Sequence, residues 1–333
     1  MVTTLSRCAV QLLVVLLGMA GCGAGGGPSN LPLRLVRDVA LPGAAARFDY
    51  QDVDPDARRL YIAHLGADDI DVVDLDRLEP VGTVSGVSQA HGVRLASDLP
   101  RVYATATGTD EVVSIDTGSL RIVGRAPTGR FPDGVGYDPT RHLVAVSDKD
   151  DGSETVLDAV TARPRRTVRL GKEVGNVTHD PSSGAMLAAV RPPDELVAFD
   201  PASGTVTGRI SLPGCDGAHG VYVDAASRRA FVACENNAHL AVVDLPGRRP
   251  LTMERVGSDP DVLAFDAGLR RLYVAAESGV VSVFAVDGPG VRKLGQGRLA
   301  ARAHTVAVDP RTHNVFFPLE NVDGHPVLRV MRP

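Results

Sequence analysis

The chain has 333 residues, of which 44% are hydrophobic, 23% are charged and only 4% are aromatic, with no tryptophan. Its formal net charge is −5 at pH 7, and removal of an N-terminal segment containing Arg7 would make it −6. This mild acidic balance argues against general affinity for nucleic acid, which depends on many Lys and Arg contacts to phosphate.

Residues 1–22 predict an export signal of the lipoprotein type. Arg7 precedes an apolar run, residues 10–17, that is too short to span a bilayer, which needs about 20 apolar residues. Small residues before Cys22 resemble a bacterial lipobox, in which the cysteine carries a diacylglycerol; a plain cleaved secretory signal is the alternative. With lipid on Cys22, residues 23–32 would be a flexible tether. We then expect an extracytoplasmic protein, lipid-anchored to the bacterial cell membrane.

A short motif recurs through the rest of the chain, from residues 48–55 (FDYQDVDP) to residues 303–310 (AHTVAVDP). The equivalent positions are 42 to 44 residues apart and define seven units, anchored at Asp54, Ala96, Asp138, Asp180, Asp224, Asp266 and Asp309. Solenoid and propeller repeats both occur near this length. The content of each unit must therefore decide between them.

Each unit contains four short segments typical of strands. Examples are residues 60–63 (LYIA), the alternating residues 70–74 (IDVVD) and the outer residues 121–125 (RIVGR). Runs of β-branched residues between turn residues favour strands, and no helical apolar stripe persists. The sequence thus predicts an all-β protein, a seven-bladed β-propeller of four-stranded blades over residues 33–333. We expect it to be a monomer.

The two ends of this region predict how the ring closes. The last unit supplies only three strands, near residues 305–308, 315–318 and 327–331, while residues 33–41 form a strand that belongs to no complete unit. Pairing this N-terminal strand with the last unit would remove the open edges of an incomplete ring.

Two cysteines remain in the mature chain besides Cys22. Cys215 and Cys234 fall at the entry of the first strand and the exit of the second in the fifth unit, and antiparallel pairing brings those ends together. In an oxidising compartment they predict a disulfide that closes a short loop. The alternative is a soft metal site formed by these thiols with Asp216, His219, Glu235 and His239, although the spacing matches no zinc pattern.

Aspartates recur where the third segment of a unit ends: Asp74, Asp116, Asp158, Asp200, Asp244 and Asp287. An aspartate that enters a tight turn accepts hydrogen bonds from the next backbone N–H groups. We interpret these six residues, and most of the anchor aspartates, as turn caps.

Ionisable residues also recur five positions before the anchors, at Asp49, His91, Asp133, His219, Asp261 and His304, with Gly175 in the fourth unit. Antiparallel pairing places the exit of each second strand on the same face, at His64, Asp148, Glu235, Glu277 and Glu320, with Arg191 in the fourth unit. Carboxylates and imidazoles are therefore expected around one mouth of the central channel, either as structural groups or as a ligand site. A metal site there would use His91, His219, His304 and Asp261 to hold one divalent ion.

Residues 271–275 (RLYVA) with 281–284 (VSVF), and 131–135 (FPDGV) before 137–139 (YDP), resemble the repeats of YVTN-repeat propellers of the YncE type. The similarity covers nearly all of residues 33–333 and implies an exported seven-bladed propeller, in a family mostly without an assigned reaction. Nucleic-acid binding is associated with this family, but the acidic balance and few aromatic residues argue against it here. More distantly, the chain is similar to lactone-hydrolysing propellers, whose catalytic set does not align onto it.

Two classes of function follow. The first is a binding scaffold whose acidic, histidine-bearing mouth holds a metal, a small ligand or a partner protein of the cell envelope. The second is a metal-dependent hydrolase of lactones or related esters, in which the ion polarises the carbonyl and a carboxylate activates water. A propeller fold hosts both classes, so the fold by itself does not indicate catalysis, and we favour the first class.

Overall fold

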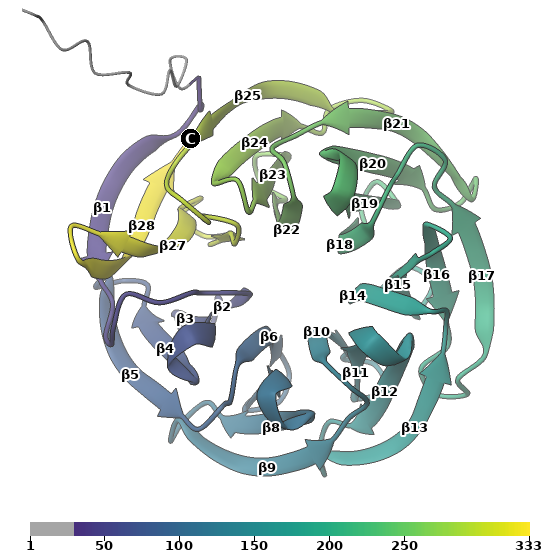
Figure 1. Cartoon of the computed structure of the whole chain (residues 1–333), viewed down its shortest axis with the longest axis horizontal. Helices are drawn as coiled ribbons and strands as arrows, with labels where there is room; N and C mark the ends of the chain where they lie inside the picture. Colours follow the sequence, from purple (N-terminus) through teal and green to yellow (C-terminus); the bar gives the residue numbers. More distant parts are fainter. Residues whose placement is uncertain (1–29) are drawn as a thin grey trace, which may run out of the picture.

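The computed structural model describes residues 30–333, so the predicted signal, the lipidation site Cys22 and tether residues 23–29 lie outside it. Residues 30–333 form seven four-stranded antiparallel sheets arranged as blades around a central channel (Figure 1). This confirms the predicted seven-bladed β-propeller. In the described part of the chain no helix has the length and apolar character needed to cross a membrane.

Each blade runs from an innermost strand to an outer strand. The innermost strands are β2 (Gln51–Asp54), β6 (Ala90–Ala96), β10 (Pro132–Asp138), β14 (Glu173–Asp180), β18 (Ala218–Asp224), β22 (Pro260–Asp266) and β26 (Ala307–Val308). The second strands are β3 (Arg59–His64), β7 (Arg101–Ala106), β11 (Leu143–Asp148), β15 (Ala185–Arg191), β19 (Arg229–Cys234), β23 (Arg271–Ala276) and β27 (Val315–Val322). The blades are numbered one to seven in this order.

The third strands are β4 (Asp69–Asp74), β8 (Glu111–Asp116), β12 (Ser153–Asp158), β16 (Glu195–Phe199), β20 (His239–Asp244), β24 (Val280–Ala285) and β28 (His325–Arg332). The outer strands are β5 (Glu79–Ser85), β9 (Arg121–Pro127), β13 (Arg163–Arg169), β17 (Val206–Ser211), β21 (Arg249–Arg255), β25 (Arg292–Arg298) and β1 (Arg34–Ala40). Short 3₁₀ turns join the second and third strands of four blades: η1 (Leu65–Ala67), η2 (Thr107–Thr109), η3 (Lys149–Asp151) and η4 (Glu235–Asn237).

The ring closes between the two ends of the described chain. The N-terminal strand β1 pairs antiparallel with β28 and completes the seventh blade, as predicted. Across this pair Arg329 donates to both carboxylate oxygens of Asp38, with an Nη2–Oδ2 distance of 2.6 Å. Residues 30–32, which we predicted to be tether, instead lie against blade six, where the Asn30 carbonyl oxygen and Pro32 crowd Gly295 and Leu31 packs on the core.

The hydrophobic core is divided among the seven interfaces between adjacent blades. Seven clusters of buried residues each take side chains from two neighbouring blades. Tyr273 of β23 and Phe317 of β27, for example, are fully buried between blades six and seven. Successive side chains of a strand point to opposite faces of the sheet, and in these blades both faces carry apolar residues. A single blade cannot bury both faces, so each face packs against a neighbouring blade. Only the closed ring buries all of them.

The turns carry the expected aspartate caps. Asp74 Oδ1 accepts hydrogen bonds from the backbone N–H groups of Asp76 and Arg77, at 3.0 and 2.8 Å. Anchor aspartates also link blades, because Asp309 of blade seven accepts both guanidinium donors of Arg58 in blade one, at 2.9 and 2.8 Å. These aspartates are structural, as interpreted from the sequence.

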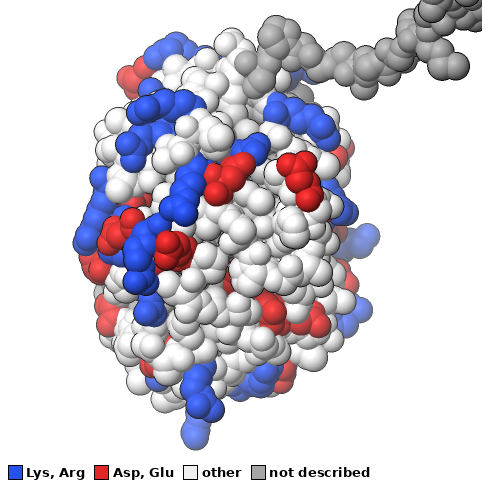
Figure 2. All heavy atoms as spheres, turned by 90° about the vertical axis from the view of Figure 1, so that its left-hand side faces the viewer, with Lys and Arg blue, Asp and Glu red and all other residues white. Residues whose placement is uncertain are grey.

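On the rim that carries β1, basic and acidic side chains lie interspersed among uncharged residues (Figure 2). Pairs such as Arg329 with Asp38 and Arg77 with Asp74 mix the two signs there. This part of the rim therefore forms no single-sign surface.

Candidate functional site

A repeated backbone device presents the predicted side chains at the channel mouth. Five innermost strands have a register shift, typical of a β-bulge, at the site position: β6, β10, β14, β18 and β22. In five blades the residue two positions before the site residue has a left-handed φ between 48° and 75°: Gln89, Phe131, Gly217, Asp259 and Arg302. A bulge re-aims the side chain that it carries. In the blades that carry it, this local geometry therefore re-aims the site residue; Asp49 has neither feature.

Glycines let neighbouring innermost strands approach each other closely at this level. A Cβ atom on Gly92 would lie 2.2 Å from the carbonyl oxygen of Asp133, and one on Gly220 would lie 1.8 Å from that of Asp261. Any larger residue would therefore push apart neighbouring strands of the ring, including those that place His219 next to Asp261 of the following blade.

The mouth is a cavity of about 420 Å³. Its lining residues come from five blades: Arg47, Asp49, Tyr50, Leu65, Gln89, His91, Phe131, Asp133, Lys149, His219, Glu235, Asp261 and Glu277. Seven of the nine predicted ligand-binding residues belong to this set. His304 lies behind it, with ring nitrogens 3.9 Å from Asp261 Oδ2 and 3.6 Å from Glu277 Oε2. The ring therefore gathers most of the predicted constellation.

Within it, Asp49, Asp261 and His304 are buried and each offers a ligand atom within 4.8 Å of the others. The Nδ1 atom of His304 lies 2.9 Å from the Arg302 carbonyl oxygen, which only an N–H can satisfy, and its Nε2 atom lies 3.5 Å from Arg47 Nη2. That Nε2 atom lies 3.9 Å from Asp261 Oδ2. Asp49 Oδ1 is buried and has no hydrogen-bond partner among residues 30–333. These three side chains could together hold one cation.

The other histidines support the two carboxylates. His219 Nε2 lies 3.3 Å from Asp261 Oδ1 and 3.8 Å from Asp133 Oδ2. His91 Nε2 lies 3.9 Å from Asp49 Oδ2, and its Nδ1 donates to the Gln89 carbonyl oxygen at 2.8 Å. The predicted metal set of His91, His219, His304 and Asp261 is thus divided, since Asp49 joins His304 and Asp261 while the other two histidines lie beside carboxylates.

Burial and crowding separate the pKa values of the two carboxylates. Burial, reinforced by the charges of Asp261 and Asp133, raises the pKa of Asp49 to about 7. Burial would also raise the pKa of Asp261, but the hydrogen bond and charge of His219, the charge of His304 and the Tyr50 hydroxyl hold it below its usual range. Likewise, burial opposes protonation of His219, yet Asp261 and Asp133 keep its pKa raised. Without a cation, these crowded carboxylates cannot all ionise at neutral pH without cost.

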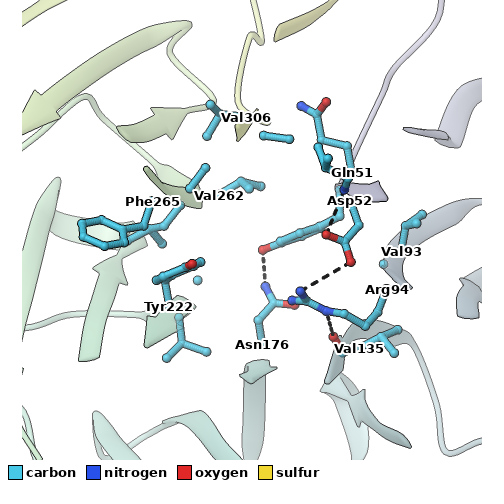
Figure 3. A pocket seen from close by; sticks show the side chains of 18 of the residues that line it. Gln51, Asp52, Val93, Arg94, Val135, Asn176, Tyr222, Val262, Phe265 and Val306 are labelled. Atoms are coloured by element: carbon cyan, nitrogen blue, oxygen red, sulfur yellow. Dashed lines mark hydrogen bonds and ion pairs between the residues drawn. The ribbon is translucent and has the colours of Figure 1, made fainter. Parts of the chain in front are cut away.

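A hydrogen-bonded bar crosses the channel below the mouth. The Tyr50 hydroxyl donates to Asp261 Oδ1 at 2.9 Å and accepts from the Asn176 amide, so it links blades one, four and six. Tyr50 also lines a smaller cavity of about 180 Å³ in the channel, shown in Figure 3. There Arg94 Nη1 lies 3.5 Å from Asp52 Oδ2 and its Nε donates to the Val135 carbonyl oxygen at 3.2 Å. The bar separates this inner cavity from the mouth.

Besides His304, four residues predicted at this face do not line the cavity: His64, Asp148, Arg191 and Glu320. Arg191 instead pairs with Glu173 of its own blade and with Glu235 of the next. His64 turns to the third strand of its own blade, with Nδ1 3.0 Å from Asp71 Oδ2. Asp148 turns the same way and accepts from the Thr155 hydroxyl at 2.8 Å. Glu320, predicted as a ligand-binding residue, pairs with Arg302 instead. Hydrogen bonds within the blade therefore withdraw these side chains from the shared face.

The cysteines of blade five are joined. Cys215 and Cys234 form a disulfide with a Cα–Cα distance of 5.2 Å, so their thiolates are not available as metal ligands. His239 donates through Nδ1 to the Asn237 carbonyl oxygen at 2.7 Å, and Asp216 accepts from Asn236 at 2.9 Å. The alternative soft metal site is therefore not formed.

The sequence analysis does not identify Arg47, Tyr50 and Lys149 as mouth residues, nor Asn176 as a partner of Tyr50 below it. Arg47 Nη2 lies 2.5 Å from Glu277 Oε1 and 3.8 Å from Asp49 Oδ2. One signal was available for Tyr50, because it follows the site residue at the position that is glycine in three other blades, at 92, 134 and 220. The large polar side chain of Tyr50 therefore departs from the commonest residue at this position of the repeat.

A scan against protein-family models finds no match, and a search of curated proteins finds none either. The solved structures do offer matches. The chain is similar to hydrazine synthase of Kuenenia stuttgartiensis, with a TM-score of 0.75 and 14% identity over 88% of this chain and 96% of that one. It is also similar to the WD40 repeats of RRP9, with a TM-score of 0.74 and 10% identity over 90% of this chain and 100% of that one. A chain of the mitotic checkpoint complex matches with a TM-score of 0.74 and 11% identity over 98% of this chain and 99% of that one. What they share with this chain is the fold.

Proposed function

We propose that this protein is an extracytoplasmic, lipid-anchored propeller that binds one divalent metal ion at its channel mouth. The observation that carries the proposal is the convergence of Asp49, Asp261 and His304 to within 4.8 Å. Two carboxylates and one imidazole are hard to borderline ligands, which suit Zn²⁺ or Mn²⁺ better than a soft ion.

The surroundings support this assignment. Metal-ligating histidines commonly donate their second ring N–H to a carbonyl oxygen, as His304 does to Arg302. Ligating carboxylates are in turn held by hydrogen bonds, as Asp261 is by Tyr50. A divalent ion would also partner the buried Asp49 oxygen and relieve the repulsion between the two carboxylates.

Thermal melts of the full chain with Zn²⁺ or Mn²⁺ at pH 7.5 test the proposal, because a ligand that binds only the folded state raises the melting temperature. We expect a shift for the wild type that is lost in Asp49→Asn and His304→Ala. The matched control is His325→Ala, which removes an exposed histidine at the start of β28. An unchanged wild-type midpoint with every ion, or an equal shift in His304→Ala, would exclude the site. Lactone hydrolysis by metal-loaded protein alone would move the assignment to the hydrolase alternative.

The cellular assignment rests on the sequence of residues 1–22 and on the YVTN-type motifs. It predicts that Cys22→Ser yields protein without lipid mass, released from the membrane fraction. Wild-type protein found wholly in the medium and without lipid would contradict it. A partner in the envelope, rather than nucleic acid, fits the scaffold fold, since one similar structure belongs to a multiprotein complex.

A further inference from the structure

The proposed metal site leaves coordination positions open toward the mouth. Three protein ligands are fewer than the four to six that Zn²⁺ or Mn²⁺ takes, and sites with three protein ligands keep room for water or a small molecule. Asp49 and Asp261 line the cavity of about 420 Å³, which is large enough for a small organic anion beside the ion. Two buried atoms next to it, Asp49 Oδ1 and His219 Nδ1, have no hydrogen-bond partner within the described chain.

Blade three contributes a cation, Lys149, to the lining of the same cavity. Lys149, in η3, lies with Nζ 5.3 Å from the centroid of the Phe131 ring, and its backbone N–H donates to the Phe131 carbonyl oxygen at 3.0 Å. Among residues 30–333, no carboxylate lies within ion-pair distance of its ammonium group, whereas Arg47 pairs with Glu277 and Arg191 with Glu235. Lys149 is therefore the mouth cation that remains free to bind an added anion.

The charge of the mouth makes the order of binding specific. Five carboxylates line the cavity, namely Asp49, Asp133, Glu235, Asp261 and Glu277. Two lining cations face them, Arg47 and Lys149, so the formal charge of the lining is −3 when the imidazoles are neutral. This charge repels an anion, and a divalent ion cancels most of it. An anionic ligand should therefore bind only after the metal.

We propose that the metal-loaded mouth binds a small dicarboxylate or tricarboxylate. One carboxylate completes the coordination of the ion and another pairs with Lys149. This inference rests on the proposed metal site and adds the class of its second ligand, the order of binding and the residue that recognises it.

Equilibrium dialysis of radiolabelled malonate against the full chain, with and without Mn²⁺, tests the inference, with bound Mn²⁺ measured in the same samples. We expect malonate to bind only with Mn²⁺ present. Lys149→Ala should weaken malonate binding about tenfold, the scale of one charge-assisted hydrogen bond, and leave Mn²⁺ binding unchanged. Lys149→Arg should restore most of the affinity, and Lys172→Ala, which removes an exposed lysine between β13 and β14, should change nothing.

The outcomes separate the two proposals. Three results would each overturn the inferred carboxylate ligand and leave the metal site standing. They are Mn²⁺ binding without malonate binding, equal malonate binding with and without Mn²⁺, and no effect of Lys149→Ala. If Mn²⁺ does not bind and Zn²⁺ leaves the melting temperature unchanged, the metal site is overturned and the inference with it.

Discussion

Removal of the Cys215–Cys234 disulfide should destabilise the propeller by an amount set mainly by loop size. The bond spans a sequence separation of 19 residues and ties the approach to β18 to the end of β19. In the chain-entropy treatment, opening a loop of this size raises the entropy of the unfolded chain and so lowers the free energy of unfolding by about 3 kcal/mol. Cys234 is fully buried, so Cys→Ala at both positions also removes packed sulfur, which adds roughly 1 kcal/mol.

Urea unfolding of the protein, followed by far-UV circular dichroism, measures this loss. The Cys215→Ala, Cys234→Ala double variant should lose about 4 kcal/mol relative to the oxidised wild type, and the reduced wild type about 3 kcal/mol, because only the variant also loses the sulfur atoms. The slope of free energy against urea should stay similar if the same surface is exposed on unfolding.

The reduced wild type is the control that isolates loop closure from packing. Equal stability of the oxidised and reduced wild type would refute the loop-entropy reasoning. Two freely alkylated thiols in protein prepared under oxidising conditions would show that the bond itself is absent.

Two further predictions concern buried charge. Burial, together with the charge of Asp148, raises the pKa of Glu154 well above its usual range, so its ionisation opposes folding and wild-type stability falls as pH rises above about 4.3. Glu154→Gln should remove this loss, so its advantage in the unfolding midpoint should grow from pH 4 to pH 7; a constant difference would contradict the assignment. At the ring closure, Arg58→Ala leaves the buried Asp309 carboxylate without its guanidinium partner and should cost about 3 kcal/mol in urea unfolding. Arg311→Ala removes an exposed pair and should cost less than about 1 kcal/mol, and equal losses would show that burial does not matter here.

The fold was predictable because its determinants are local and repeated. The period of the anchors, the capped turns after aspartates such as Asp74, and four strand segments per unit are all properties of short stretches of chain. Repetition makes each weak local signal strong, since seven copies must adopt one structure. Closure by β1 also followed from counting strands, because an unpaired edge is unfavourable.

The position of the site residues within each repeat was predictable for the same reason, but which of their side chains meet was not. The sequence alone determined that Asp49, His91, Asp133, His219, Asp261 and His304 share one register of the ring. Only the tertiary structure decided which of them meet, because bulges and left-handed residues turn most of these side chains and because Tyr50 reaches Asp261, 211 residues away. It also decided that His64 and Asp148 satisfy partners inside their own blades. Strand periodicity is encoded locally, whereas the distances between side chains across a channel depend on how seven separately packed blades close into one ring.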